Sequence, residues 1–526
     1  IADSDFWWHL KTGQFIWQTH KLPVPDPFAY TTAVFHPAYA GEDLTRHFNL
    51  THEWLSQSLF YLGYRVAGFP GVVLLRAVVL ALFCGLVALI VYRRTKGFYR
   101  SLAASFVTAA FAAGFALDRP YIFTFLLLAA TVAILEFRRP LWLLPVVMLV
   151  WANCHGGFFL GWIVLGAYCL AEHRNWRLLA WSAAAILISG VNPNGFRVLQ
   201  ILTYYRRSFL TSTLLEWARP ALWPPGIFTL LLAGAPAALL WARRKGRISD
   251  WLLYAAFAAA AITAQRNIVL VGFVAPIIIA SYLPWRPRVP VWANYGVAVL
   301  VLAGLGTGVA RASFFQLRAA EWKFPKGAAD FLAAHHVTGP MFNSYEYGGY
   351  LIWRLWPQER VFIDGRALSE SLFLDYTRIL YNHDESGGKS AQELLDQYGV
   401  DVIVSNAFEY ASGTLYLLVP SLADPQQTKW KLVYSGPEAA VFMRHPPAGV
   451  EPIDSMKVFD HLEEECETHI EHEPDFPRCA RSLGQVFYRG GDFARARRWI
   501  GVYLSHPHEP DPEAERTFQQ LMNNGR

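Results

Sequence analysis

The sequence predicts a mainly α-helical membrane protein, in which a polytopic bundle is followed by a small α/β domain and a helical tail. Of its 526 residues, 54% are hydrophobic, 17% are charged and 15% are Phe, Trp or Tyr. Aromatic residues of this kind are enriched at water–lipid interfaces. Two further observations support this fold class: a series of apolar stretches in the middle of the chain, and a change to a soluble composition after Arg311.

Apolar stretches of about 20 residues are long enough to cross a hydrocarbon core about 30 Å thick, and several here are shorter. We therefore interpret residues 70–311 as a transmembrane domain of about ten spans. Residues 1–69 form a first extracytoplasmic loop with interfacial helices. The predicted spans cover residues 70–92, 101–117, 121–137, 141–153, 158–171, 176–191, 224–242, 251–264, 268–283 and 291–309.

Every second connection between the spans is basic, and basic connections stay on the cytoplasmic side of a membrane. Most of the basic excess behind the net charge of +5 lies in these connections, where it sets the membrane topology. The sequence therefore requires no nucleic-acid partner. The basic connections contain Arg93, Arg94, Lys96, Arg138, Arg139, Arg174, Arg177, Arg243, Arg244, Lys245, Arg247, Arg286 and Arg288.

The other connections carry hydrogen-bonding and ionisable groups, and we expect them outside the cytoplasm together with Asp5 and Asp364. Each has an ordinary structural explanation as well, because Asn-Pro-Asn-Gly forms a good turn and His-Gly-Gly loosens the backbone between helices. Their common side favours a functional site. These connections contain Asp118, Arg119, Asn153, His155, Asn192, Asn194, Glu216, Arg219 and Arg266.

The first loop places Asp3, Asp5 and His9 among aromatic rings, beside hydrophobic segments. Carboxylates are costly at membrane depth, which makes them functional candidates. A short loop Asp can equally cap a helix. Downstream, residues 51–61 mix polar and apolar side chains at helical spacing, which is typical of an interfacial helix. An outward first loop also leads us to expect a further membrane helix upstream of Ile1.

Residues 322–445 alternate predicted helices and strands, which indicates a small α/β domain. We expect helices over 326–334 and 393–398, and strands over 340–343, 360–364 and 400–405. Tyr345 beside a Gly pair, and Asp364 and Arg366 after the strand at 360–364, stand where side chains could reach a ligand. Asp-Gly after a strand is also an ordinary turn.

Residues 446–526 form a polar, helical tail, in which 479–503 resembles one tetratricopeptide hairpin. One such unit cannot bury a solenoid core. The tail therefore either covers the α/β domain or begins a longer array, and it suggests a protein partner. The five cysteines lack C-x-x-C spacing, and Cys466 with Cys479 could form a disulfide outside the cell.

Several motifs together resemble bacterial polytopic proteins related to the GT-C glycosyltransferases, and the resemblance covers the membrane part and the α/β domain. GT-C enzymes, which include protein O-mannosyltransferases and the lipid A aminoarabinose transferase, use polyprenyl-phosphate sugars and carry an acidic first extracytoplasmic loop. The motifs are Asp3-Ser4-Asp5-Phe6-Trp7-Trp8-His9, Arg119-Pro120, Asn153-Cys154-His155-Gly156-Gly157, Asn192-Pro193-Asn194-Gly195 and Phe342-Asn343-Ser344-Tyr345.

This resemblance implies a multi-pass protein of the bacterial inner membrane that takes a sugar from a polyprenyl-phosphate donor. Asp3 or Asp5 would match the catalytic carboxylate, since attack by an acceptor hydroxyl needs a base. An Arg can bind the lipid phosphate through two parallel hydrogen bonds. The predicted catalytic residues are Asp3, Asp5 and His155. The predicted substrate-binding residues are Trp7, Trp8, His9, His52, Glu53, Arg119, Asn153, Asn192, Asn194, Arg266, Tyr345, Asp364 and Arg366.

Asp3 and Asp5 also match the D-x-D pattern with which some transferases hold Mg²⁺ or Mn²⁺, although not all GT-C enzymes need a metal. The cofactor therefore stays open. Two other functions remain as alternatives. A transporter or flippase for a lipid-linked sugar needs charged or broken helices near the bilayer midplane. A non-catalytic scaffold for envelope assembly would tolerate loss of the first-loop carboxylates.

Overall fold

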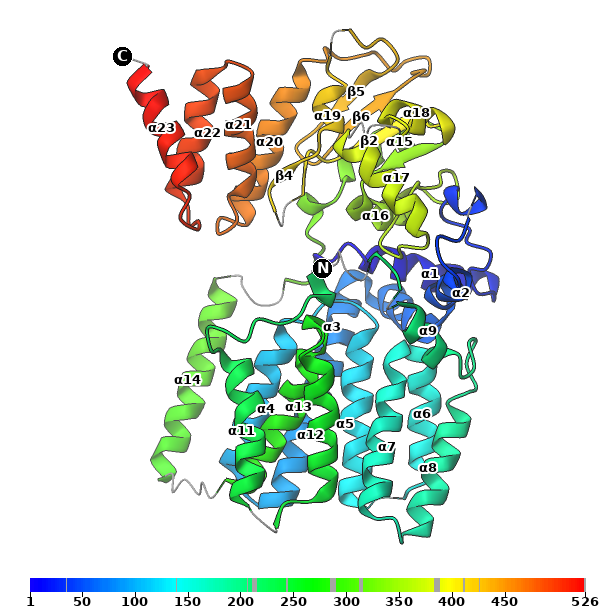
Figure 1. Cartoon of the computed structure of the whole chain (residues 1–526), viewed down its shortest axis with the longest axis vertical. Helices are drawn as coiled ribbons and strands as arrows, with labels where there is room; N and C mark the ends of the chain where they lie inside the picture. The colour runs from blue at the N-terminus through cyan, green and yellow to red at the C-terminus, as the bar shows by residue number, and fades with distance from the viewer. Residues whose placement is uncertain are drawn as a thin grey trace. The chain divides into compact units, whose positions relative to one another are not determined.

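The computed structural model of the chain divides into two compact units (Figure 1). Unit 1 consists of Ile1, His9–Val24 and Tyr39–Ala319, and unit 2 consists of Ala2–Trp8, Pro25–Ala38 and Ala320–Arg526. The first helix, α1 (Phe6–Thr19), contributes residues to both. The structure describes residues 1–34, 36–138, 140–205, 207–210, 215–242, 245–283, 290–311, 316–382, 388–409, 412–424 and 426–524.

Unit 1 is a bundle, and one of its helices overlaps each of the ten predicted apolar stretches (Figure 1). Within the part of the chain that the structure describes, three helical segments are long and apolar enough to cross a membrane, namely Glu42–Thr95, Gln265–Tyr282 and Trp292–Ala310. The helices over the ten stretches are α3 (Trp54–Thr95), α4 (Phe98–Ala113), α5 (Tyr121–Phe137), α6 (Leu143–Cys154), α7 (Phe159–Ala171), α8 (Trp176–Ile188), α11 (Ile227–Trp241), α12 (Ile248–Ala261), α13 (Ile268–Tyr282) and α14 (Val291–Ala310). Between the stretches, unit 1 adds α2 (Glu42–Thr51), α9 (Val198–Tyr205), η2 (Gly156–Phe158), η3 (Leu215–Trp217) and η5 (Gln265–Asn267).

Helix α3 is kinked, and the kink separates the predicted interfacial helix from the first predicted span. Ala67 and Gly68 leave the helical conformation, with Gly68 at φ 63°, and Pro70 follows. Only glycine adopts such a φ without a steric penalty. The two limbs also approach closely, because a Cβ on Gly71 would lie 2.1 Å from the carbonyl oxygen of Gly63.

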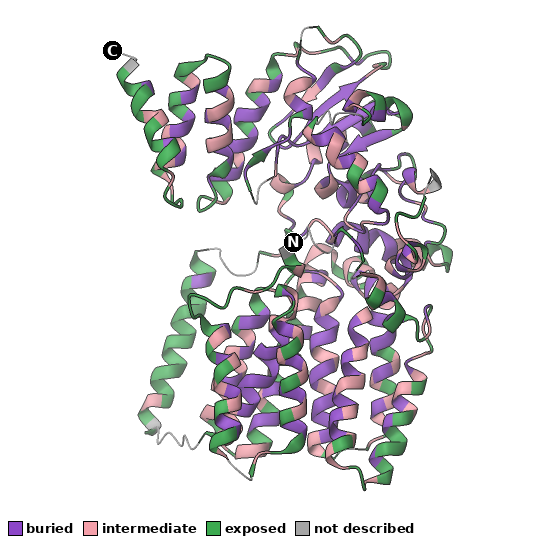
Figure 2. Ribbon diagram, in the orientation of Figure 1, coloured by how far each residue is buried: buried purple, intermediate pink, exposed green. Residues whose placement is uncertain are grey.

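Helix α14 differs from the rest of the bundle in its surroundings (Figure 2). Only 6% of its most apolar stretch is buried within the protein, compared with 56% for the segment Gln265–Tyr282. A helix that is apolar on all sides is stable where another apolar medium covers it. This exposure agrees with a helix that faces lipid.

A buried ion network joins four elements at one end of the bundle, and we call it the Arg94 network. The Arg94 guanidinium lies 2.7 Å from Glu136 Oε1 and 3.0 Å from Asp250 Oδ1. Arg247 Nη1 lies 2.8 Å from Glu136 Oε2, and the Tyr282 hydroxyl donates to Asp250 over 2.7 Å. Arg94 was predicted to face the cytoplasm, and that orientation stays a prediction. The predicted cytoplasmic residues Arg139, Arg243, Arg244, Arg286 and Arg288 lie outside the described residues.

Unit 2 contains a four-stranded mixed sheet in the order β1-β2-β6-β5. The first pair is parallel and the other two pairs are antiparallel. The strands are β1 (Met341–Asn343), β2 (Val402–Ser405), β5 (Lys431–Ser435) and β6 (Ala440–Met443), and a separate pair is formed by β3 (Phe408–Glu409) and β4 (Thr414–Leu415). The helices around them are α15 (Lys326–Ala334), α16 (Tyr345–Leu355), α17 (Glu370–Tyr381), α18 (Ala391–Gln397) and α19 (Leu418–Ser421), with the short η1 (Thr31–Val34) and η6 (Glu321–Lys323).

The predicted strand over 360–364 is wrong. Residues 361–364 are buried, as their apolar sequence suggested, but the segment pairs only through an isolated bridge between Val361 and Ala29. A side chain replaces the neighbouring strand, because the Phe362 N–H donates to Asn343 Oδ1 over 2.8 Å. Hydrophobicity reported the burial correctly but could not reveal the hydrogen-bond partner.

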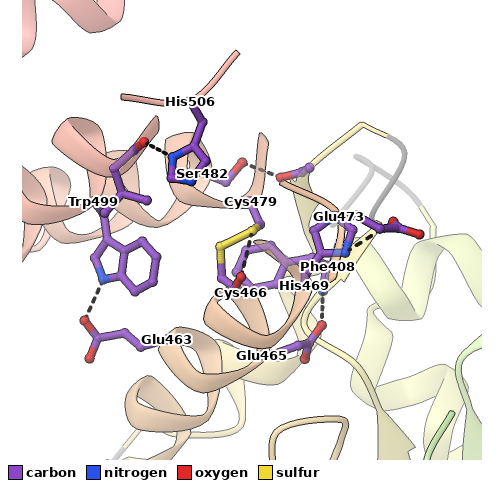
Figure 3. Close-up of a disulfide and its surroundings, with 12 residues drawn as sticks. Phe408, Glu463, Glu465, Cys466, His469, Glu473, Cys479, Ser482, Trp499 and His506 are labelled. Atoms are coloured by element: carbon purple, nitrogen blue, oxygen red, sulfur yellow. Dashed lines mark hydrogen bonds and ion pairs between the residues drawn. A yellow bond between two sulfur atoms is a disulfide. The ribbon is translucent and has the colours of Figure 1, made fainter. Parts of the chain in front are cut away.

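The tail helices are α20 (Lys457–His472), α21 (Arg478–Arg489), α22 (Phe493–Ser505) and α23 (Pro512–Asn524). A disulfide joins Cys466 of α20 to Cys479 of α21, as the sequence suggested (Figure 3). Nearby, the Trp499 indole donates to Glu463 Oε1 over 2.6 Å. One hydrophobic core runs from the sheet into these helices, which favours a tail that covers the α/β domain. The tetratricopeptide resemblance stays a prediction.

A buried imidazole fixes α20 to the sheet region. His461 Nδ1 donates to the Gly436 carbonyl over 2.6 Å, and its Nε2 lies 3.2 Å from Glu465 Oε2. Glu465 also accepts the Ala407 N–H over 2.8 Å. Burial lowers the pKa of His461, but the hydrogen bond and charge of Glu465 outweigh burial, so the pKa is raised above its ordinary value.

Candidate functional site

The polar connections of unit 1 bring one carboxylate together with three imidazoles, and we call this group the Glu53 cluster. Glu53 Oε1 lies 3.2 Å from His52 Nε2 and 3.7 Å from His155 Nε2, and Glu53 Oε2 lies 3.6 Å from His9 Nδ1. The Gln57 amide adds a contact of 3.3 Å to His9. All of these residues except Gln57 were predicted site residues.

Different elements supply the members of the cluster. Glu53 and His52 lie between α2 and α3, His9 lies in α1, and His155 lies between α6 and η2. His155 is extended and accepts the Gly157 N–H at its Nδ1 over 3.0 Å. A Cβ on Gly157 would lie 2.9 Å from that nitrogen. The His-Gly-Gly sequence therefore allows the backbone to pass close to the ring.

The hydrogen bonds define which ring nitrogens carry protons. His155 Nδ1 accepts from Gly157, so a neutral His155 carries its proton on Nε2, which faces Glu53. His52 Nδ1 lies 2.7 Å from the Phe48 carbonyl, while its Nε2 faces Glu53. Both ring nitrogens of His52 thus face hydrogen-bond acceptors, and the Glu53 carboxylate is one of them.

The cluster keeps Glu53 ionised and His155 neutral. Burial alone would raise the pKa of Glu53, but the charge and hydrogen bond of His52 and the charges of His9 and His155 outweigh burial and lower the pKa to about 2. Burial lowers the pKa of His155 to about 3, against the opposing charge of Glu53. The buried carboxylate therefore remains an anion throughout the physiological range.

Arg266 lies in η5 and supplies a cation to the same region. It pairs with Glu216 over 3.0 Å and lies over the Trp217 ring at 4.6 Å from the centroid. After burial and Glu53, its charge is among the groups that act on the pKa of His155. Arg119 is half-buried just before α5, and its neighbour Asp118 pairs with Arg76 over 2.7 Å.

The predicted asparagines stabilise the turns around the cluster. Asn153 Oδ1 accepts the Trp54 indole N–H over 2.8 Å. Asn192 donates to the Ser189 carbonyl over 2.7 Å, and Asn194 donates to the Thr51 hydroxyl over 2.9 Å. These contacts position the connections, and direct contact of the asparagines with a substrate stays a prediction.

Asp3 and Asp5 belong to unit 2. The Asp5 N–H donates to Asp3 Oδ1 over 3.0 Å. Asp5 also approaches Gly365 so closely that a Cβ on this glycine would lie 1.8 Å from Asp5 Oδ1. A Cβ on Gly349 would likewise lie 2.7 Å from the Ser4 carbonyl oxygen. These glycines therefore permit the acidic loop to pack onto unit 2.

Trp7 and Trp8 are buried in the structure, so neither presents an open face for a sugar ring. Trp7 packs edge-on against Phe324 and Tyr350, with centroid distances of 5.1 and 4.8 Å. Aromatic side chains in such contacts contribute chiefly to a core. The aromatic run thus anchors the acidic loop to unit 2.

Asp364 and Arg366 form a buried ion group with Asp26, a residue that no sequence motif pointed to. Arg366 Nη1 lies 2.7 Å from Asp26 Oδ1, and Arg366 Nη2 lies 2.6 Å from Asp364 Oδ2. The Phe28 N–H also donates to Asp26, over 3.1 Å. The Tyr345 hydroxyl, from a residue 20 positions earlier in the chain, donates to the Gly365 carbonyl over 3.1 Å. A structural role accounts for these contacts, and substrate binding here stays a prediction.

Within the described parts of both units, no group of three or more His, Cys, Asp or Glu side chains has a geometry that could hold a metal ion. The prediction of Mg²⁺ or Mn²⁺ at Asp3 and Asp5 therefore gains no third ligand of these types from the structure.

Comparison with solved structures identifies the fold. The oligosaccharyltransferase of Archaeoglobus fulgidus in its apo form has a TM-score of 0.51 and 10% identity, over 87% of this chain and 73% of that one. The same values apply to the form tethered to an acceptor peptide containing the NVT sequon. For archaeal AglB with an inhibitory peptide and a dolichol-phosphate, the TM-score is 0.48, with the same identity and coverage.

Sequence comparisons give no family model that matches and no match among curated proteins. The structural likeness therefore concerns the fold alone. At the coarse level it confirms the expected mostly helical fold with a small sheet region, which this chain shares with the archaeal oligosaccharyltransferase.

Proposed function

We propose that this chain is a membrane glycosyltransferase that moves a sugar from a polyprenyl-phosphate donor to an extracytoplasmic acceptor. The Glu53 cluster carries this proposal: it is a buried carboxylate kept anionic by imidazoles, with the cation Arg266 acting on the same group. The fold shared with an oligosaccharyltransferase supports a transferase over the other two alternatives.

Glycosyl transfer develops opposite charges at two places. Positive charge grows at the sugar carbon, in an oxocarbenium-like transition state, while negative charge grows on the departing phosphate. Glu53 would stabilise the first through its fixed negative charge. Arg266 would bind the second through its planar pair of donors, and Arg119 would assist it.

A third group must accept the proton of the acceptor, and Glu53 is a weak base because its pKa is about 2. We assign the base to Asp5, with Asp3 as its alternative, as the resemblance to GT-C enzymes implies. Replacing the base by Asn should lower turnover by roughly 10² to 10⁴ while donor binding persists. If Asp3→Asn and Asp5→Asn both retain full activity, the first loop takes no part in the mechanism.

The location proposed for unit 2 is extracytoplasmic. Its Cys466–Cys479 disulfide supports this location, since disulfides persist in oxidising compartments and are rare in the cytosol. The bacterial inner membrane, the orientation of the spans and a protein partner for the tail belong to the same proposal.

Transfer by the purified protein in nanodiscs, with a panel of polyprenyl-phosphate sugars, tests the function directly. In Glu53→Gln the rate should fall by about 10² to 10³, as expected for loss of a preorganised charge. Glu172→Gln is the matched control, because Glu172 pairs only with the exposed Arg138 among the ion pairs of the described residues. The control should retain its activity.

A different result would support one of the alternatives. Movement of the lipid-linked sugar across the membrane without transfer would indicate a transporter. No activity with any donor, together with retained envelope assembly in cells carrying Glu53→Gln and Asp5→Asn, would indicate a scaffold.

A further inference from the structure

Residues 218–227, which are the loop after η3 together with the first residue of α11, expose apolar side chains in unit 1. Leu222 is 47% exposed, Trp223 is 80% exposed and Ile227 is 56% exposed. The loop also contains three prolines, at 220, 224 and 225. Exposed apolar side chains that lie this close together in the chain are candidates for a binding or membrane contact.

Both halves of this loop are attached to the bundle. The Gln265 N–H donates to the Ala218 carbonyl over 2.7 Å, and the Thr229 hydroxyl donates to the Leu222 carbonyl over 3.3 Å. Proline rings further restrict the backbone. The apolar surface is therefore held in place, which lowers the entropic cost of binding a ligand.

The loop begins directly at the proposed phosphate site. Glu216 and Trp217, the two residues before it, hold Arg266, and Gln265 beside Arg266 donates to its first residue. From Trp217 to Trp223 an extended chain covers at most about 20 Å. A phosphate on Arg266 would therefore have the first isoprene units of its lipid within reach of Leu222 and Trp223.

We propose that the 218–227 loop binds the isoprenoid tail of the donor next to the phosphate held by Arg266. This inference rests on the proposed function. The tail and the loop are both apolar, and Trp223 and the prolines offer rigid surface at little conformational cost. The exposed Arg219 within the loop adds a second cation near the same phosphate. The loop would then distinguish long lipid carriers from short ones.

The test measures binding, so it does not depend on transfer. Undecaprenyl phosphate and geranyl phosphate are titrated onto the full chain in nanodiscs. In the double variant Leu222→Ser/Trp223→Ser, affinity for undecaprenyl phosphate should fall about 10- to 100-fold, because two large apolar contacts are lost. Affinity for geranyl phosphate should stay within about twofold, whereas Arg266→Lys should weaken both ligands.

Trp241→Ser is the matched control, since Trp241 is 69% exposed at the far end of α11. It should leave both affinities unchanged. Trp223→Phe should retain most of the undecaprenyl phosphate affinity, which separates lost apolar surface from lost folding. Photoactivatable undecaprenyl phosphate should label residues 218–227 more strongly than photoactivatable phosphatidylcholine does.

Three results would overturn the inference: equal losses for both ligands in the double variant, an equal loss in Trp241→Ser, or equal labelling by phosphatidylcholine. The last result would mean that the loop only contacts the bilayer. If the binding results hold but no sugar is transferred, the lipid site stands and the proposed function fails.

Discussion

Unit 1 holds buried carboxylates at both ends of its bundle, and the two groups differ in the cations that neutralise them. The Arg94 network uses guanidinium groups, whereas the Glu53 cluster uses imidazoles. Helix α7 connects them, because Tyr168 donates to Glu136 and lies 13 residues after His155, which corresponds to about 20 Å of helix. A guanidinium stays charged at all ordinary pH values, whereas an imidazole can also be neutral, as His155 is in this cluster.

From this difference we expect the Arg94 network to contribute to stability and the Glu53 cluster to contribute to the chemistry. A guanidinium stays charged and fixes two carboxylates at once, so the Arg94 network resists change. The side chains of His52 and His155 are 14% and 15% exposed, against 5% for Arg94. The Glu53 cluster is thus the more open group and the one whose charge a ligand can alter. We expect substitutions in the two groups to affect different measurements.

The largest effect on stability is expected for Arg94→Met, which leaves Glu136 and Asp250 without their shared cation. Breaking a buried pair in this way should destabilise the protein by about 3 to 5 kcal/mol. Unfolding in detergent, followed by denaturant titration, measures the loss. Arg138→Met is the control, because Arg138 is 74% exposed and pairs with Glu172 at the surface. A loss of less than about 1 kcal/mol in Arg94→Met, as expected for the control, would contradict the comparison.

A smaller loss is expected for Glu53→Gln. The amide keeps the size of the carboxylate and can still form hydrogen bonds with the surrounding rings, so destabilisation should stay within about 1 to 3 kcal/mol. The same unfolding experiment applies, with transfer rates measured on the same samples. A loss as large as that of Arg94→Met would make the Glu53 cluster a structural element.

Arg266→Lys should weaken donor binding by about tenfold, or about 1.4 kcal/mol, because lysine lacks the planar pair of donors. Arg119→Lys, compared in the same titration with a polyprenyl phosphate, shows whether one or both arginines contact the phosphate. Arg138→Lys serves as the control. Unchanged affinity in both variants would assign Arg266 to its pairing with Glu216 and Trp217.

Acid should weaken unit 1 through His155. In the folded state its pKa is about 3, below the ordinary value of 6.5. The unfolded chain therefore takes up a proton first, and stability falls as the pH drops from about 6.5 towards 3. In His155→Gln this part of the pH dependence should be absent. An identical pH profile in the variant would place the titration elsewhere.

His461 in unit 2 should show the opposite sign. Its folded pKa lies above 6.5, since Glu465 outweighs burial. Its contribution to stability is complete below 6.5 and is lost as the pH rises through the folded pKa. Unfolding of His461→Gln and of the unaltered chain across this range measures the difference. A variant that still loses stability on raising the pH would refute the assignment.

The sequence predicted where helices of unit 1 lie because an apolar stretch is a local property, whereas the ten-span membrane topology stays a prediction. Helices overlap all ten stretches, and the helix predicted over 326–334 coincides with α15. The members of the Glu53 cluster were also identified, from their polar types beside apolar spans. Their arrangement was not, because Glu53 meets His155 across about a hundred residues, and spacing carries no information on such contacts.

Because spacing carries no information on long-range contacts, the roles of several residues in unit 2 were also not predicted. The sequence suggested Trp7 as a surface for a sugar, but the structure places it in a core. Its partners Phe324 and Tyr350 are distant in the chain, so the sequence could not show this packing. Asp26 drew no attention, yet it neutralises Arg366. A sequence motif shows which chemistry is available, and only the fold shows which groups already use it.

The covalent link between α20 and α21 has a consequence for making this protein. Both cysteines are buried in the core that the tail shares with the sheet, so a reduced chain would place two thiols where the native molecule has one bond. Protein recovered from a reducing host compartment would therefore differ from exported protein in unit 2. Preparations for the assays above should be exported before they fold, with thiol titration as a check that only Cys84, Cys154 and Cys169 react.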